Sequence, residues 1–219
     1  MTKLLVVDPG NDDVEVIDLN DPSRNCQLPD LPYSMSVMGA GFTSSGPMVC
    51  SGYYSNYETS AGNCYGLSAK NQFVKLSGGL IPRSGASSIV TEDGQLVMIG
   101  GRRSWSWSDM STEKLKNSEI LNVFESKIEK GLLKQYLSSH CSIRINATTA
   151  MVLGGGNKTY YVDLVTFQVT NGPEMLERRY SFGCALLRHN NQDFVIAAGG
   201  FRKDTTEFLN LESGTWSKG

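Results

Sequence analysis

A phrase of four or five apolar residues that ends on a glycine pair recurs along this chain of 219 residues. Clear copies are QLVMIGG at 95–101, AMVLGGG at 150–156 and FVIAAGG at 194–200, and weaker copies are KLLVVDPG at 3–10 and PMVCSGYY at 47–54. The second residue of each pair stands at 10, 52, 101, 155 and 200, so the spacing is 42 to 54 residues. Such a period is typical of propeller and solenoid repeats, so we expect successive copies of one unit.

Further short segments with the alternation of β-strands flank each glycine pair. A small-residue segment precedes the later pairs, as in RSGASSIV at 83–90 and RRYSFGCALL at 178–187. An alternating segment follows every pair, as in VEVIDL at 14–19 and TTEFLNL at 205–211, and a weaker fourth strand closes the unit. Gly, Asn, Asp and Ser turns separate these segments. Each unit is therefore predicted to be one four-stranded antiparallel sheet.

This order of elements resembles the kelch repeat of β-propellers. The copy from Arg178 to Trp216 holds the arginine, the small-residue strand, the glycine pair, Glu207 in the third strand and the tryptophan. Phe73 and Phe167 are expected to replace that tryptophan in two other copies. The resemblance implies an all-β propeller of about five four-stranded antiparallel blades.

The repeats predict one domain of about 19 strands. It contains a partial blade at 1–32 and blades at 33–81, 82–137, 138–176 and 177–219. Because the partial blade has no opening strand, we expect a fragment of a longer propeller; the alternative is a five-bladed ring that closes imperfectly. Open blade edges would offer a dimerisation surface.

Two explanations compete for the glycine pairs. A phosphate-binding loop needs a helix after the glycines and usually a Lys-Ser/Thr at its end, whereas here a turn and another strand follow. The other explanation is architectural, because glycine fits where backbones crowd and no Cβ is accommodated. The surrounding sequence favours the second.

The overall composition is that of a globular domain, with 40% hydrophobic and 19% charged residues. A net charge of −2 argues against a nucleic-acid partner. No apolar run approaches the length of a membrane span, and the N-terminal apolar stretch is too short for a signal peptide.

Five cysteines raise the question of disulfides. Cys50 ends one predicted strand and Cys64 begins the next, which places the two within reach of a bridge. The pattern VCSG…NCY also resembles kelch units of secreted invertebrate proteins; the alternative is two unpaired buried thiols. Cys141 and Cys184 begin neighbouring blades, where we expect the blades to diverge, which argues against a bridge. Cys26 has no obvious partner.

Two N-x-Thr sequons, at Asn146 and Asn157, fall in predicted hairpin loops where a glycan could be accommodated. Together with the Cys50–Cys64 pair they favour an extracellular or secreted protein. An odd number of cysteines fits a truncated extracellular chain and a reduced cytoplasmic one equally well.

Residues for catalysis are sparse. The chain has two histidines, His140 at a strand start and His189 in a polar turn, and Cys141 beside His140 would face the opposite way. A copper radical oxidase on a kelch scaffold would need two histidines, tyrosines and a cysteine at the axis, but His189 is expected at a blade's rim. We therefore predict no catalytic residues, no metal and no cofactor.

Binding to a protein is the function that the resemblance implies, through loops around the central channel. The expected contact residues are Arg83, Arg102, Arg103, Trp105, Trp107, Arg178, Arg179, Tyr180 and Arg202. Guanidinium groups can clamp carboxylates, so the expected ligand is a protein or peptide of acidic character. For Arg83 and Arg178 the alternative is a structural role, paired with a buried carboxylate or with backbone carbonyls between blades.

The loop at 102–117 is long for a hairpin. Trp105 and Trp107 would project from the same side if it is extended, and exposed tryptophan beside arginine is favoured at interface centres. The alternative is that both tryptophans fold down over the blade as a hydrophobic cap.

Three functional hypotheses remain. The first is a non-enzymatic interaction propeller outside the cell. The second is the substrate-recognition domain of an intracellular ubiquitin-ligase adaptor, and the third, an oxidase, is the least supported.

Overall fold

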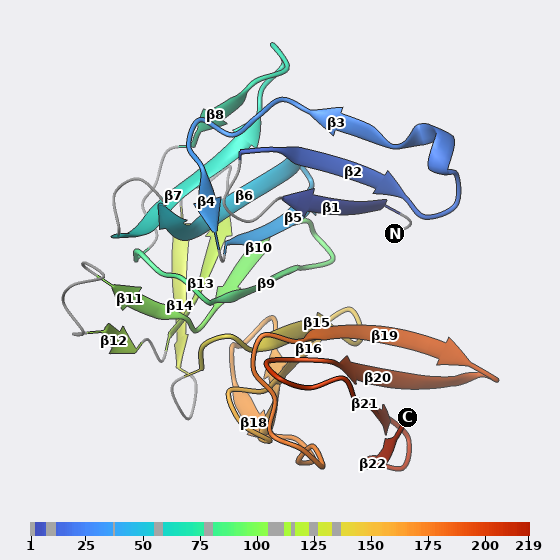
Figure 1. Cartoon of the computed structure of the whole chain (residues 1–219). Coiled ribbons are helices and arrows are strands. Elements are labelled where there is room, and N and C mark those ends of the chain that lie inside the picture. Colours follow the sequence, from blue (N-terminus) through green and yellow to red (C-terminus); the bar gives the residue numbers. More distant parts are fainter. Residues whose placement is uncertain are drawn as a thin grey trace.

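The computed structural model describes residues 3–7, 12–36, 38–54, 59–76, 81–104, 112–114, 117–122, 127–132 and 137–219. In these ranges 22 strands build antiparallel sheets in a β-propeller arrangement (Figure 1). The predicted all-β propeller is confirmed. The strands beyond the expected number are β4 (Met35–Ser36), β11 (Arg102–Ser104) and β12 (Thr112–Lys114).

Four blades hold four or five strands each, and a first one holds three. The first blade contains β1 (Lys3–Val7), β2 (Val14–Asp18) and β3 (Cys26–Leu28), with the short helix η1 (Pro22–Arg24) before β3. The second contains β4, β5 (Gly39–Thr43), β6 (Gly46–Tyr54), β7 (Thr59–Leu67) and β8 (Phe73–Lys75). Within the described ranges, no helix has the length and apolarity that a membrane crossing requires.

The remaining blades repeat the order of inner, second, third and outer strand. The third contains β9 (Ser87–Val90), β10 (Leu96–Ile99), β13 (Asn117–Asn122) and β14 (Lys127–Leu132), and β11 pairs with β12 beside it. The fourth contains β15 (Cys141–Arg144), β16 (Thr149–Leu153), β17 (Thr159–Asp163) and β18 (Val169–Asn171). The fifth contains β19 (Gly183–His189), β20 (Gln192–Ala198), β21 (Thr206–Asn210) and β22 (Thr215–Lys218).

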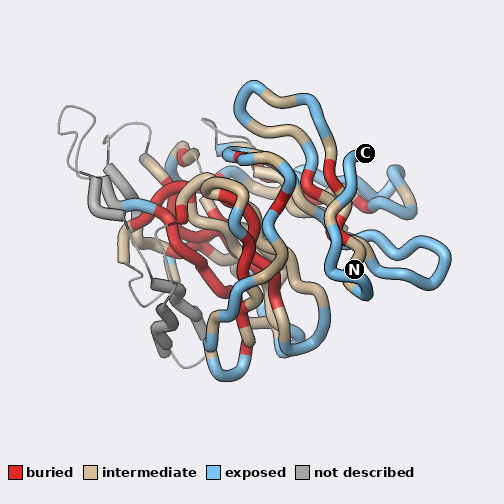
Figure 2. Tube along the Cα trace, turned by 90° about the horizontal axis from the view of Figure 1, so that it is seen from below, coloured by how far each residue is buried: buried red, intermediate tan, exposed pale blue. Residues whose placement is uncertain are grey.

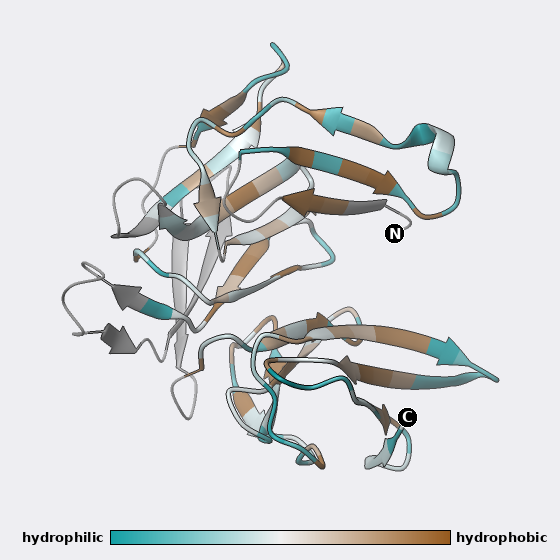
Figure 3. Cartoon of the chain, in the orientation of Figure 1, coloured by the Kyte–Doolittle hydropathy of each residue, from teal (hydrophilic) through white to brown (hydrophobic). Residues whose placement is uncertain are grey.

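Each pair of neighbouring blades buries one hydrophobic cluster between its facing sheets (Figures 2 and 3). In β10, Leu96 and Met98 face the second blade while Val97 and Ile99 face the fourth. All four side chains are fully buried, because successive residues of a strand point to opposite faces and both faces are covered. Burial on both sides explains why the apolar run before the glycine pair is continuous.

The glycine pairs serve the architecture, as predicted. Gly100 and Gly101 have φ values of +62° and +96°, and a Cβ on Gly100 would lie 2.7 Å from the carbonyl oxygen of Leu137 at the entry to the next blade. Side chains are excluded there by both conformation and space. The expected aromatics also lie between blades, since Phe73, Phe167 and Trp216 all join interblade clusters.

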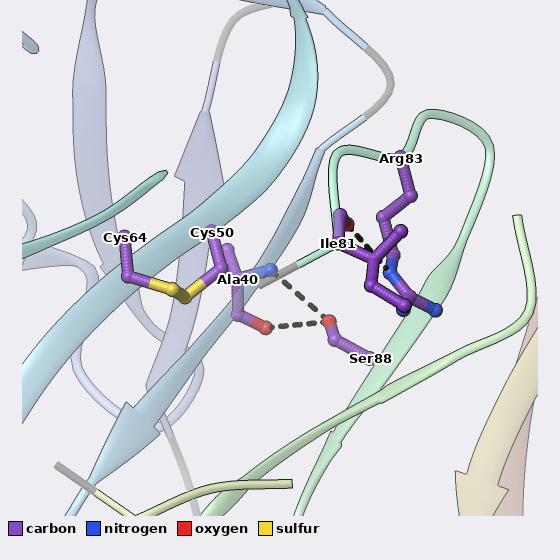
Figure 4. Close-up of a disulfide and its surroundings, with 6 residues drawn as sticks. All are labelled: Ala40, Cys50, Cys64, Ile81, Arg83 and Ser88. Atoms are coloured by element: carbon purple, nitrogen blue, oxygen red, sulfur yellow. Dashed lines mark hydrogen bonds between the residues drawn. A yellow bond between two sulfur atoms is a disulfide. The ribbon is translucent and has the colours of Figure 1, made fainter. Parts of the chain in front are cut away.

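Polar and covalent links join the inner strands around the axis. The backbone N–H of Ala40 in β5 donates to the Ser88 hydroxyl in β9 at 3.0 Å, and that hydroxyl donates back to the Ala40 carbonyl at 3.0 Å (Figure 4).

Within the second blade, a disulfide joins Cys50 of β6 to Cys64 of β7, so the predicted pairing is confirmed (Figure 4). Cys26 is exposed and free.

A second disulfide, between Cys141 of β15 and Cys184 of β19, contradicts the expectation that the blades diverge there. The two Cα atoms are 6.0 Å apart, which is an ordinary disulfide spacing. The expectation was wrong because the inner strands lie nearest the axis, where neighbouring blades converge. The bond therefore clips the fourth blade to the fifth.

Replacing both cysteines of this disulfide, in the double variant Cys141→Ala with Cys184→Ala, should lower the free energy of unfolding by about 4 kcal/mol, because the bond closes a loop of 43 residues. The midpoint of urea denaturation, compared between the oxidised chain and the double variant, measures this loss. An unchanged midpoint would show that the fourth and fifth blades hold together without the bond.

Candidate functional site

At one end of the propeller, the residue after a glycine pair lies beside the residues that lead into an inner strand. In the third blade, Arg102 and Ser84 exchange two backbone hydrogen bonds of 2.9 and 2.8 Å. In the fifth blade, the N–H of Phe201 donates to the carbonyl of Tyr180 at 2.8 Å. We call these joined segments the loop rim, which comprises residues 83–86 and 100–104 of the third blade and 176–182 and 199–205 of the fifth.

Arg179 points into the protein and is fully buried. Its guanidinium donates to the Glu207 carboxylate at 2.9 and 3.0 Å, to the Gly199 carbonyl at 2.7 Å and to the Thr205 carbonyl at 2.8 Å. The same carboxylate accepts the N–H of Leu176 at 2.7 Å. This network holds the rim in place and leaves Arg179 unable to reach a partner in this conformation.

Arg83 is also fully buried, and it donates to the carbonyls of Gly100 at 2.7 Å and Ile81 at 3.3 Å. The structural role considered for Arg83 is thus the one observed. In the fifth blade the role belongs to Arg179, whereas Arg178 is exposed. The sequence could not distinguish two adjacent arginines, because Arg179 is fixed by a backbone bridge to Gly156, which follows β16 in the neighbouring blade.

The fifth blade carries an exposed cluster on the loop rim, which we call the rim patch: Leu176, Arg178, Tyr180, Phe201 and Arg202. Phe201 is 68% exposed, and the guanidinium carbon of Arg202 lies 5.1 Å from the centre of its ring. Large apolar side chains exposed together with arginine are typical of protein contact surfaces. Phe201 and Leu176 were not predicted from the sequence, although the aromatic directly between the glycine pair and Arg202 was a signal.

A tight turn carries two residues of the rim patch, Phe201 and Arg202. The N–H of Lys203 donates to the carbonyl of Gly200 at 3.0 Å, with Phe201 and Arg202 between them. Arg202 has φ +57°, a left-handed conformation that disfavours a residue with a side chain by about 1–2 kcal/mol. Backbone strain of this kind concentrates at functional sites.

Charged contacts anchor the same turn to the rim. Lys203 donates to the Glu177 carboxylate at 2.6 Å, and Thr205 donates to it at 3.1 Å. The hydrogen bond from Lys203, followed by that from Thr205, lowers the pKa of Glu177. These contacts keep the Glu177 carboxylate negative beside the exposed arginines. The rim patch is therefore positively charged at Arg178 and Arg202, while the charges of Glu177 and Lys203 neutralise each other.

In the third blade, the rim contributes Arg102, which is exposed. The backbone of Arg103 lies in β11, paired with Glu113. Trp105 and Trp107 lie outside the described residues, so the two interpretations of that loop both remain predictions.

His140 and Ser87 form a polar contact between the third and fourth blades. The Ser87 hydroxyl lies 2.8 Å from Nε2 of His140, and it also contacts the Ser142 hydroxyl. Burial lowers the pKa of His140 to about 4, so the ring is neutral at pH 7 and a weak base. Such a base would activate a serine poorly. In the described part of the chain, no three His, Cys, Asp or Glu side chains gather as metal ligands.

The two sequons differ in their surroundings. Asn146 is exposed in the β15–β16 turn, beside a groove of about 570 Å³ between the fourth and fifth blades. Asn157 is half-buried, and its amide donates to the Glu174 carboxylate at 3.0 Å. The hydroxyl of Thr159 is buried and donates to the Pro173 carbonyl at 2.8 Å. A glycan is therefore accommodated more easily at Asn146.

No family model matches the chain, and no curated protein matches it. The propeller arrangement and the rim patch thus stand on the structure itself.

Stability should fall in mild acid because of His140. Its pKa is about 4 in the folded chain against 6.5 for an unperturbed histidine, so the unfolded chain binds the proton first as the pH falls. The loss should develop between about pH 6.5 and 4 and reach about 3 kcal/mol.

Urea denaturation at a series of pH values, for the natural chain and for His140→Gln, isolates this contribution from that of the carboxylates. The exposed His189→Gln variant is the matched control, and its free energy of unfolding should depend on pH as strongly as that of the natural chain. If the free energy of unfolding depends on pH equally in the natural chain and in His140→Gln, the assignment to His140 is contradicted.

Proposed function

We propose that this chain is a non-enzymatic protein-interaction module, a kelch-type propeller that binds an acidic peptide segment of a partner through the rim patch. The observation that carries the proposal is the pairing of an exposed aromatic surface with a strained, exposed arginine at one turn. Rigid scaffolds commonly present their binding residues on such loops.

Two features support an acidic ligand. Arg178 and Arg202 are both exposed, and planar guanidinium groups suit carboxylates because they donate two parallel hydrogen bonds. Tyr180 and Phe201 expose apolar surface beside these arginines. A surface that is charged only for solubility would not need this apolar area, whereas a binding site uses it. Since glycine would adopt the turn without strain, the arginine at 202 is better explained by binding than by folding.

Arg202→Gly should separate the two roles. The variant should be as stable as the natural chain or more stable by up to about 1 kcal/mol, because the left-handed conformation no longer opposes a Cβ. It should nevertheless lose binding to acidic peptides, as should Phe201→Ala, when an array of Asp/Glu-rich peptides is probed with labelled protein. The binding of the natural chain should weaken as salt rises.

The matched control is Arg188→Ala, an exposed arginine at the opposite, hairpin end of β19. It should leave peptide binding unchanged. If Arg202→Gly binds as well as the natural chain, or if Arg188→Ala weakens binding equally, the attraction is a general property of positive charge and the rim patch is not the site.

We further propose an extracellular, secreted glycoprotein. The two disulfides are compatible with an oxidising compartment, where such bonds persist. The exposed sequon at Asn146 supports the same location. The competing proposal is the recognition domain of an intracellular ubiquitin-ligase adaptor, in which the same cysteines would be reduced.

Non-reducing peptide mapping by mass spectrometry, on protein secreted from a eukaryotic host, tests the compartment. We expect Cys50–Cys64 and Cys141–Cys184 crosslinks, a free Cys26 and a glycan on Asn146. Retention in the host with free thiols would favour the intracellular adaptor. The Asn146→Gln variant, which removes the acceptor, should lose the glycan without losing the disulfides.

A further inference from the structure

A groove of about 570 Å³ between the fourth and fifth blades has no role in the binding function proposed above. The β15–β16 turn and β17 line it on one side, and the β19–β20 turn and the residues after β21 line it on the other. Because β19 begins at the loop rim and runs away from it, the groove lies at the end of the propeller opposite to the rim patch. Its volume is within the range of sites for small organic molecules, about 300–1,000 Å³.

The floor of the groove is apolar. Ile145, Tyr161 and Leu211 line it, and all three pack against the hydrophobic cluster between the two blades. Each is half-buried, and burial raises the pKa of the Tyr161 hydroxyl, so this side chain is neutral at pH 7. An occupant with an apolar face would remove the rest of this surface from water, which is favourable.

The walls of the groove are polar. Asn191, Gln192, Asp193 and Glu212 line it and are exposed. The two carboxylates disfavour an anionic occupant, and both already have partners: Arg188 lies 3.8 Å from Asp193, and the Gln192 amide donates to Glu212 at 3.4 Å. A neutral molecule with many hydroxyl groups fits such walls, because each hydroxyl both donates and accepts. An apolar face combined with hydroxyl groups is the chemistry of a pyranose sugar.

One residue of the lining indicates where such a sugar would come from. Asn146 belongs to an N-x-Thr sequon and lines the groove. Its amide oxygen accepts the N–H of Thr148 at 3.0 Å and the Thr148 hydroxyl at 3.4 Å, whereas its nitrogen Nδ2 donates no hydrogen bond within the described part of the chain. The nitrogen that carries the glycan in such sequons is therefore free at the groove.

The groove is also far from the disulfide that joins the same two blades. The Cys141–Cys184 bond connects β15 to β19 near the loop rim. Asn146 is five residues beyond Cys141, roughly 16 Å along the strand at about 3.3 Å per residue. A glycan that starts at Asn146 and contacts the β19–β20 turn would thus connect the two blades at their other end.

We infer that the groove binds the first sugar residues of a glycan carried by Asn146, so that the glycan joins the fourth blade to the fifth. This inference rests on the proposed secreted glycoprotein. The amide nitrogen of Asn146 bonds to C1 of N-acetylglucosamine, as that carbon leaves a lipid-linked diphosphate donor and the nitrogen gives up one proton. The C–H face of the sugar then packs on Tyr161, and its hydroxyls face the polar walls.

Covalent attachment makes a weak contact sufficient for this role. A free sugar with millimolar affinity for an open groove would be mostly dissociated at ordinary concentrations. A short link to the site supplies an effective concentration in the millimolar range, without any additional contact. The groove therefore needs no high affinity for the sugar in order to be occupied.

Hydrogen exchange tests the contact in protein secreted from a eukaryotic host. The glycosylated chain should exchange the amides of residues 191–193 and 211–212 roughly fivefold more slowly than Asn146→Gln, a factor that corresponds to about one net hydrogen bond. Asn157→Gln is the matched control and should keep the full protection. Asn157 is the other sequon asparagine, but it lies outside the groove and its nitrogen donates to Glu174.

Contacts of the sugar distinguish binding in the groove from a glycan that only shields the surface. In the glycosylated chain, nuclear Overhauser effects should connect the ring protons of Tyr161 with the first N-acetylglucosamine. Gln192→Ala, which removes an amide from the wall, should reduce the protection. Gln27→Ala, at an exposed glutamine of the first blade, should not.

Three results would overturn the inference. A secreted chain with a glycan on Asn146 but without the protection and the sugar contacts would overturn it and leave the proposed glycoprotein intact. A secreted chain without a glycan on Asn146 would overturn both. Equal protection in the natural chain and in Asn146→Gln would show that the protein alone covers these amides, and the glycan would have no part in it.

Discussion

The burial of both faces of every complete inner blade is the constraint on which the rest of this structure depends. A sheet whose two faces are covered needs apolar residues at successive positions, and Leu96–Ile99 meets this need with four fully buried side chains. Sheets that pack face to face must also converge at one edge, and there the backbone leaves no room for side chains. The continuous apolar run and the glycine pair that ends it are consequences of the same packing.

Close to the axis, the blades are joined by interactions of three different kinds. A hydroxyl of Ser88 links the second and third blades, and Ser87 with His140 links the third and fourth. The Cys141–Cys184 bond links the fourth and fifth. Because the inner strands are held in this way, the loops at their ends start from fixed positions. A strained turn such as that of Arg202 can persist only on a support of this rigidity.

Features that depend on local spacing were predictable from the sequence, whereas those that depend on contacts between blades were not. The glycine pairs, the strand order and the Cys50–Cys64 bond all arise within one repeat. The Cys141–Cys184 bond depends on how closely two repeats approach, which the spacing within either one does not reveal. The choice between Arg178 and Arg179 depends on the backbone bridge between Arg179 and Gly156 of the neighbouring blade, and both arginines look alike in sequence.

The buried side chains of the fourth and fifth blades show how a repeat protein can change its chemistry without changing its fold. Removing one member of the Arg179–Glu207 pair would leave an uncompensated buried charge, at a loss of about 3–5 kcal/mol, while replacing both by apolar residues is often neutral. Leu137 with Tyr160 is the outcome expected of such a double replacement. Blades can therefore differ only in matched sets.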